Sequence, residues 1–242
     1  MNHSMTFTKI VKRASETLLV RFPAIITLAT FPPSVGLFLF FFNNPSPPEG
    51  NFWFQVHSLN ETFLQDYIGG FSIGLVLSLA FFVSFRWNQI IKDKSYGYWL
   101  SQGVDRTQFF IYSFLQFMTI ISVGVILGQI ILYYPGGVQL SLLYHLRILI
   151  ILLCSSFLTY TSAILISEIA KDPEISLLLF AGIGLLNSSI KIEGNGFFQM
   201  TFFSGRYALN TTSFAPILLP LIVGSLFLVL ANWFHKRRDI DL

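Results

Sequence analysis

The residues that could do chemistry are few, and they do not form a catalytic set. The histidines are scattered, mostly near the chain ends or in loops: His3, His57, His145 and His235. Hydrolysis inside a membrane needs paired His and Glu ligands, a Ser/His pair or paired carboxylates, and no His-Glu-x-x-His pattern occurs. Cys154 is the single cysteine, so no intrachain disulfide or cysteine-based metal site can form. We therefore expect no enzyme activity, metal or cofactor in this chain.

The sequence also lacks features of nucleotide and nucleic acid binding. A phosphate-binding loop reads Gly-x-x-x-x-Gly-Lys and then Ser or Thr, but no glycine of this chain precedes a lysine. The net charge is +3 and the pI is about 9.0, yet the basic residues do not gather in one patch. They stand at the ends of apolar runs, which is typical of membrane topology. We therefore expect no nucleic acid partner.

A few polar side chains fall at or near membrane depth and are candidates for a substrate path. They are Gln116, Gln129, Arg147, Glu168 and Asn187. Ionisable groups inside a membrane are functional candidates by default. The alternative for Glu168 and Arg147 is snorkelling, since both lie close to a span end where the charged group can reach the interface.

The elements that must position these residues are apolar helices. Of the 242 residues, 53% are hydrophobic and 11% are charged, against about 25% charged residues in soluble domains. Six segments reach or approach the roughly 20 apolar residues that cross a bilayer as a helix. They are residues 22–42, 67–85, 109–134, 142–167, 175–190 and 214–234. The sequence therefore predicts an all-α membrane protein with six transmembrane helices, the fifth of them short.

The distribution of Lys and Arg predicts the orientation of these spans. Twelve lie on one side: Lys9, Lys12, Arg13, Arg21, Arg86, Lys92, Lys94, Arg106, Lys171, Lys236, Arg237 and Arg238. Three lie on the other: Arg147, Lys191 and Arg206. Because cytoplasmic connections carry the excess of basic residues, we expect both termini in the cytoplasm and the protein in the cell membrane.

Three segments are not simple spans. Residues 1–21 place apolar residues at helical spacing between basic ones, which predicts an amphipathic helix in the membrane interface. The alternative is a helical extension of the first span. Residues 43–66 and 191–213 are expected as outer loops. In the second, the apolar run 197–203 is too short to cross, so we expect a re-entrant or interfacial element between spans five and six. The alternative is an ordinary loop with aromatic anchors.

The cytoplasmic connection 86–108 carries the strongest signal. Gly97 and Gly103 permit turns, and Asp105 precedes the third span as a helix cap does. Between the glycines, Tyr98 and Trp99 present aromatic groups of the kind that protein interfaces use as anchors. The alternative is that these aromatics rest on lipid headgroups.

This connection resembles the coupling segment of type-2 ATP-binding cassette exporter permeases. Lys92-Asp93-Lys94 matches the charged part of the family pattern, Gly97-Tyr98 the glycine step, and residues 101–106, Ser-Gln-Gly-Val-Asp-Arg, the turn before the third span. Six spans, cytoplasmic ends and an aromatic and basic cluster near the C-terminus, at 233–240, are also similar. Tyr98 departs from the Thr that is usual in the family.

The resemblance implies a permease subunit, with residues 22–242 as its six-span domain. It would form the translocation path as a dimer of identical or paralogous subunits, and a separate cytoplasmic ATPase would bind ATP and Mg. The implied ATPase contacts are Lys92, Asp93, Gly97, Tyr98, Trp99, Gly103, Val104, Asp105, Arg106, Lys171 and Asp172. The alternative is a secondary transporter, a channel or a structural membrane subunit. A secondary transporter would place ionisable residues near the midplane, and the span centres have none.

Overall fold

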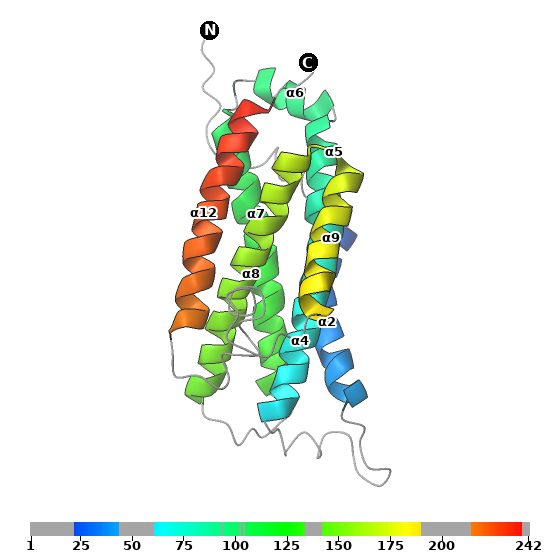
Figure 1. Ribbon diagram of the computed structural model, residues 1–242, viewed down its shortest axis with the longest axis vertical. Helices are drawn as coiled ribbons and strands as arrows, with labels where there is room; N and C mark the ends of the chain where they lie inside the picture. Colours follow the sequence, from blue (N-terminus) through cyan, green and yellow to red (C-terminus); the bar gives the residue numbers. More distant parts are fainter. Residues whose placement is uncertain are drawn as a thin grey trace.

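A computed structural model describes residues 22–43, 61–92, 94–101, 103, 105–133, 142–189 and 214–238. All the elements in these ranges are helices, and the long ones run side by side as a bundle (Figure 1). They are α2 (Phe22–Asn43), α4 (Glu61–Leu79), η2 (Ala80–Phe85, a π-helix), α5 (Arg86–Lys92), α6 (Lys94–Ser101), α7 (Arg106–Tyr133), α8 (Leu142–Ala170), α9 (Pro173–Ser189) and α12 (Ala215–Arg237).

Four stretches are long and apolar enough to cross a membrane. They are Tyr67–Phe85, Arg106–Ile130, His145–Ala170 and Ala215–Arg237. Two shorter apolar helical stretches, Ala29–Leu39 and Pro173–Ile183, lie within the first and fifth predicted spans. These helices support an all-α membrane protein with several spans.

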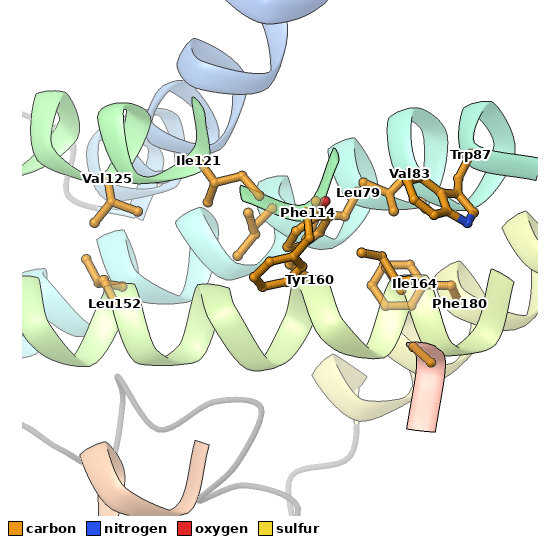
Figure 2. Close-up of a cluster of buried hydrophobic side chains, with 14 of the residues drawn as sticks. Leu79, Val83, Trp87, Phe114, Ile121, Val125, Leu152, Tyr160, Ile164 and Phe180 are labelled. Atoms are coloured by element: carbon orange, nitrogen blue, oxygen red, sulfur yellow. The ribbon is translucent and has the colours of Figure 1, made fainter. Parts of the chain in front are cut away.

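Helix α8 is the centre of the bundle. The apolar window of α8 is 72% buried, whereas that of α12 is 17% buried and leaves a wide apolar surface outside. Figure 2 shows the core around α8, where Tyr160 stacks on Phe114 of α7 at 5.1 Å between ring centroids. Leu152 and Ile164 extend the same buried face, and Phe180 joins it from α9. The buried face of α8 therefore packs against neighbouring helices of the same chain.

Glycines let α2 approach α4 closely. A Cβ at Gly70 would lie 2.8 Å from the Val35 carbonyl oxygen and 2.9 Å from the Cα of Gly36. Because no side chain separates the backbones at this point, the two helices gain contact along their length, as small residues allow in membrane proteins. This contact holds α2 on the bundle although Pro32 and Pro33 interrupt its hydrogen bonding.

The predicted connection 86–108 is mostly helical in its described residues, and only one of the two turns expected at its glycines forms. Helix α4 continues through η2 directly into α5. The helix extends past the apolar stretch that ends at Phe85 because Trp87 and Ile91 continue its buried apolar face. Gly97 lies inside α6 rather than at a turn, whereas Gly103, with φ +80°, adopts the left-handed conformation that glycine favours. Similarly, α4 begins at Glu61, so residues 61–66 of the predicted outer loop are helical.

Several predictions lie outside the described residues. They concern the interfacial helix at 1–21, the re-entrant element within 191–213 and the outer loop over residues 44–60.

Candidate functional site

The predicted coupling segment, the α8–α9 turn and the end of α12 meet at one end of the bundle. Helices α5 and α6 lie there, at the top of Figure 1, beside the first turn of α7. Side chains from these elements, far apart in the sequence, form a buried polar cluster. We define the cluster as Trp87, Asn88, Tyr96, Glu168, His235 and Arg238.

The carboxylate of Glu168 is the centre of the cluster. Glu168 is 1% exposed, and its Oε1 accepts hydrogen bonds from the indole Nε1 of Trp87 at 2.7 Å and from Nδ1 of His235 at 2.8 Å. Its Oε2 lies 3.4 Å from Nη1 of Arg238. A buried charge is tolerated when it is paired and hydrogen-bonded, and these donors satisfy that condition. The side chain does not snorkel to the surface, so that alternative for Glu168 is wrong.

The ring of His235 connects Glu168 to α6. Its Nε2 lies 2.8 Å from the hydroxyl of Tyr96, while Nδ1 faces the Glu168 carboxylate. Since an ionised carboxylate only accepts, Nδ1 carries a proton, and in the neutral ring Nε2 accepts from Tyr96. Burial raises the pKa of the Tyr96 hydroxyl far above its ordinary range, so it remains a donor. His235 lies in the last turn of α12, near the chain end as expected, but it is 1% exposed.

Arg238 closes the α8 end of the cluster. Its Nη1 donates to Oδ1 of Asn88 at 2.8 Å, and its Nη2 donates to the carbonyl oxygen of Lys171 at 3.0 Å. Lys171 has φ 57°, the left-handed conformation that commonly ends a helix, here α8. A cation at this position complements the negative end of the helix dipole. Asn88 also donates to the carbonyl of Ser84, within η2, at 3.2 Å. The cluster thus ties η2 and α5 to α8 and α12.

The π-helix η2 leads directly into Trp87 and Asn88. Single π-turns inside α-helices are often found at functional sites, because the extra residue per turn redirects the side chains that follow. Here the side chains of Trp87 and Asn88 are both fully buried within the cluster. Trp87 packs between Phe110, with centroids 5.9 Å apart and nearly perpendicular rings, and the ring of His235.

The end of the coupling segment is attached to α12 by Arg106. Its Nη1 donates to the carbonyl oxygens of Arg238 at 2.8 Å and Lys236 at 3.1 Å. Asp105 caps α7 as predicted, since its Oδ2 accepts from the backbone N–H of Thr107 at 3.0 Å. Arg106 is therefore half-buried and hydrogen-bonded to the end of α12.

The start of the coupling segment is attached to the α8–α9 turn by an exposed ion pair. Nζ of Lys92 lies 3.1 Å from Oδ2 of Asp172. Oδ1 of Asp172 accepts from the backbone N–H groups of Glu174 and Ile175, which makes Asp172 the cap of α9. The backbone N–H of Ile175 and the ammonium of Lys92 lower the pKa of Asp172 below its ordinary value. The structure thus brings together two predicted contact regions.

Other predicted coupling residues are described in part. Gly103 is exposed, and its backbone N–H donates to the carbonyl of Leu100 at 3.0 Å. Lys171 is exposed. The side chains of Tyr98 and Trp99, and the whole of Asp93 and Val104, lie outside the described residues.

The predicted path residues do not converge. Nε2 of Gln129 lies 2.9 Å from Nδ1 of His145, and this buried pair belongs to the end of the bundle opposite to Glu168. Gln116 is half-buried on α7, and Arg147 is half-buried near the start of α8. Asn187 lies in α9 with its side chain outside the described residues.

Sequence reasoning missed Trp87, Asn88, Tyr96, His235 and Arg238. A buried carboxylate at a span end requires donors, and this requirement is the signal that could have prompted a search for them. This requirement alone could not identify the partner residues, because residues that pair in space can be far apart in the sequence: Asn88 and Arg238 are separated by 150 positions. Among the described residues, no group of three His, Cys, Asp or Glu could hold a metal.

Neither family models nor curated proteins give a match to this sequence.

Proposed function

We propose that this chain is the permease subunit of an ATP-binding cassette transporter, an exporter that a separate cytoplasmic ATPase drives. The observation that carries the proposal is the attachment of α5 and α6 to the ends of α8 and α12 through the buried polar cluster. Such an attachment turns a push on α6 into a movement of the spans.

The position of α6 supports this role. Tyr96 is fully buried and holds the helix to His235, while Ser101, the last residue of α6, and Gly103 beyond it are exposed at the end of the bundle. A helix anchored through one buried side chain and exposed at its end can receive a partner's surface and pass the load inward. Interfaces between rigid parts shift as units, so closure of two ATPase subunits would rock the helices around the translocation path. ATP and Mg would be bound by the ATPase.

Charge at this end supports a cytoplasmic location. Lys92, Lys171, Lys236 and Arg237 are all exposed there. Cytoplasmic ends of membrane helices carry the excess of basic residues. In this proposal α2 and α9 complete a set of six spans, both termini are cytoplasmic, and the protein lies in the cell membrane among its lipids. The exposed apolar face of α12 is available to lipid or to a second permease subunit, identical or paralogous.

The secondary-transporter alternative is less well supported. Ion-coupled transporters place titratable groups near the midplane, where both sides can reach them alternately. The buried ionisable side chains Glu168, His235 and Arg238 lie at one end of the bundle and are bonded to one another, and the buried His145 lies toward the opposite end, bonded to Gln129.

Copurification from native membranes tests the proposal. We expect the protein to bring with it an ATPase that carries a Gly-x-x-x-x-Gly-Lys-Ser/Thr loop. The variants Trp99→Ala and Gly103→Trp should each reduce the recovered ATPase at least several-fold, because both alter the proposed contact surface.

Matched controls separate contact from folding. Gly103→Asn introduces a residue that tolerates positive φ and has a much smaller side chain than tryptophan, so this variant should retain the ATPase. Trp233→Ala removes a 45% exposed tryptophan from α12 and should also retain it. Full recovery of the ATPase with both Trp99→Ala and Gly103→Trp would reject the assignment of this surface.

A further inference from the structure

Helix α12 carries an exposed apolar stripe that leads to a tryptophan and two cations. The residues of the stripe recur three or four positions apart, so they share one side of the helix. They are Ile222, Leu226, Val229, Leu230 and Trp233, and all are exposed, Val229 by 68% and Trp233 by 45%. Lys236 and Arg237 follow in the last turn and are also exposed, at the end of the bundle where α6 lies (Figure 1).

The indole of Trp233 positions the guanidinium of Arg237. Cζ of Arg237 lies 3.9 Å from the ring centroid of Trp233, which is a cation–π contact. A guanidinium stacked on an aromatic ring keeps the N–H groups at its edge available, and these groups bind phosphate in pairs. Trp233 stands where the apolar stripe gives way to charge, the position that tryptophan favours at a membrane–water interface. A phosphate donor is thus held at the depth of lipid headgroups.

The positive charge at this site is not neutralised by the described part of the chain. Lys236 and Arg237 form no ion pair with a described carboxylate. The carbonyl groups at the C-terminal end of a helix repel an anion. At this helix end, however, Nη1 of Arg106 donates to the carbonyl oxygens of Lys236 and Arg238. The end of α12 therefore presents an attractive surface to an anion.

The stripe fits an acyl chain better than a neighbouring helix. Residues 222–233 extend over about 16 Å at 1.5 Å per residue, which matches one leaflet, about half of the 30 Å hydrocarbon core. Close contacts between helices in membranes use small residues. Gly224 and Ala231 of α12 are buried inside the chain, whereas the stripe consists of branched and aromatic side chains.

We propose that the end of α12 binds an anionic phospholipid, with its phosphate on Arg237 and Lys236 and an acyl chain along the stripe. A soluble phosphate would contact the cations but leave the apolar stripe uncovered. A zwitterionic lipid would cover the stripe, but its own ammonium group would oppose the two cations. An anionic lipid matches both parts of the surface. The site goes beyond the proposed function and does not depend on which end of the bundle faces the cytoplasm.

Photolabelling of the purified protein in phosphatidylcholine vesicles tests the proposal. Two probes carry the same diazirine in one acyl chain and differ only in the headgroup, phosphatidylglycerol or phosphatidylcholine. Each cation near an anionic lipid gives about a fivefold preference. We therefore expect the phosphatidylglycerol probe to label the peptide with Val229 and Leu230 about ten- to thirtyfold more strongly. Arg237→Gln should lower this preference about fivefold, and the double variant with Lys236→Gln should bring it within about twofold of none.

An exposed apolar face of α9 provides an internal control. Leu178 is 72% exposed, and the residue one turn nearer the same end of the bundle is the exposed Glu174, a carboxylate instead of a cation. This face should show no preference for phosphatidylglycerol. The matched control variant is Lys171→Gln, which removes an exposed cation from the α8–α9 turn at the same end. It should retain the preference at α12.

Three results would overturn the proposal. The first is equal labelling of α12 by both probes in the unaltered protein. The second is a preference that survives in the double variant or disappears in Lys171→Gln, since either would make the preference a general effect of charge. The third is crosslinking of the stripe to α12 of a second copy without lipid labelling, which would assign the stripe to a subunit contact. Because the measurement needs no ATPase, failure to find one would reject the proposed function and leave the lipid site unaffected.

Discussion

At the residue scale, the feature with the largest consequence is the buried carboxylate of Glu168. One carboxylate, on α8, accepts from an indole on α5 and from an imidazole and a guanidinium at the end of α12. A buried pair of this kind contributes little net stability compared with apolar packing, but removal of one partner is costly because the others remain buried and unpaired. The main effect of the cluster is therefore to fix the positions of α5, α8 and α12 relative to one another.

Replacement of Glu168 by Ala should destabilise the protein by about 3–5 kcal/mol, since it leaves the Trp87 and His235 donors without their acceptor and the buried Arg238 without its carboxylate partner. Glu168→Gln should cost less, because its amide oxygen still accepts from Trp87. Thermal unfolding of the purified protein in detergent measures both. The control is Glu174→Ala, which removes an exposed carboxylate. If Glu168→Ala unfolds at the same temperature as this control, the cluster does not hold the helices together.

Asp172 gives the protein a pH dependence on the acid side. Its pKa in the folded protein lies below the ordinary value of 3.8, mainly because of the Ile175 N–H and Lys92. A depressed pKa contributes stability that is fully present well above the unfolded pKa and is lost as pH falls through the folded pKa. We expect Asp172→Asn to flatten this part of the stability curve between about pH 5 and pH 3. Denaturation of both proteins across that range measures the effect, and parallel curves would contradict it.

At the element scale, the closeness of α2 and α4 is the feature most sensitive to small changes. Gly70→Ala would place a Cβ 2.8 Å from the Val35 backbone, so the helices must separate at a cost of about 1–3 kcal/mol. Gly69→Ala is the matched control, because no described atom lies within 4 Å of a Cβ there. Since Ala favours helix over Gly by about 1 kcal/mol, this control should be neutral or stabilising. Thermal unfolding compares the two, and equal effects would place α2 away from α4.

The helices also show what can be predicted from the sequence and what cannot. Hydropathy places most of the long apolar helices to within a few residues, and four of them contain stretches long enough to cross a bilayer, which requires a long uninterrupted apolar helix. It does not recognise α5 and α6, since their apolar residues, such as Trp87 and Tyr96, are interspersed with charges and a glycine that are typical of loops. The cap at Asp105 is local and was predicted correctly. The pairing of Glu168 with His235 is a tertiary contact, for which one sequence contains no signal.

At the scale of the whole molecule, the two ends of the bundle differ in a way that bears on its orientation. One end gathers the coupling segment, the α8–α9 turn and the basic end of α12, held together by Arg106, Arg238 and the Lys92–Asp172 pair. The other end includes the exposed start of α8 and the Gln129–His145 pair. The proposed function assigns the ATPase contact to the first end, so it requires that end to face the cytoplasm.

Cysteine labelling decides this orientation. The native Cys154 is buried, so a membrane-impermeant maleimide should leave the unaltered protein unlabelled. Ser101→Cys places a thiol at the exposed end of α6, and Leu143→Cys places one at the opposite end, where Leu143 is 78% exposed. Ser101→Cys should react in inside-out vesicles and not in intact cells, and Leu143→Cys should show the reverse. Because each variant is the control for the other, failed labelling is distinguishable from a wrong orientation. Reaction of Ser101→Cys from the outside alone would put α6 beyond the reach of any cytoplasmic ATPase.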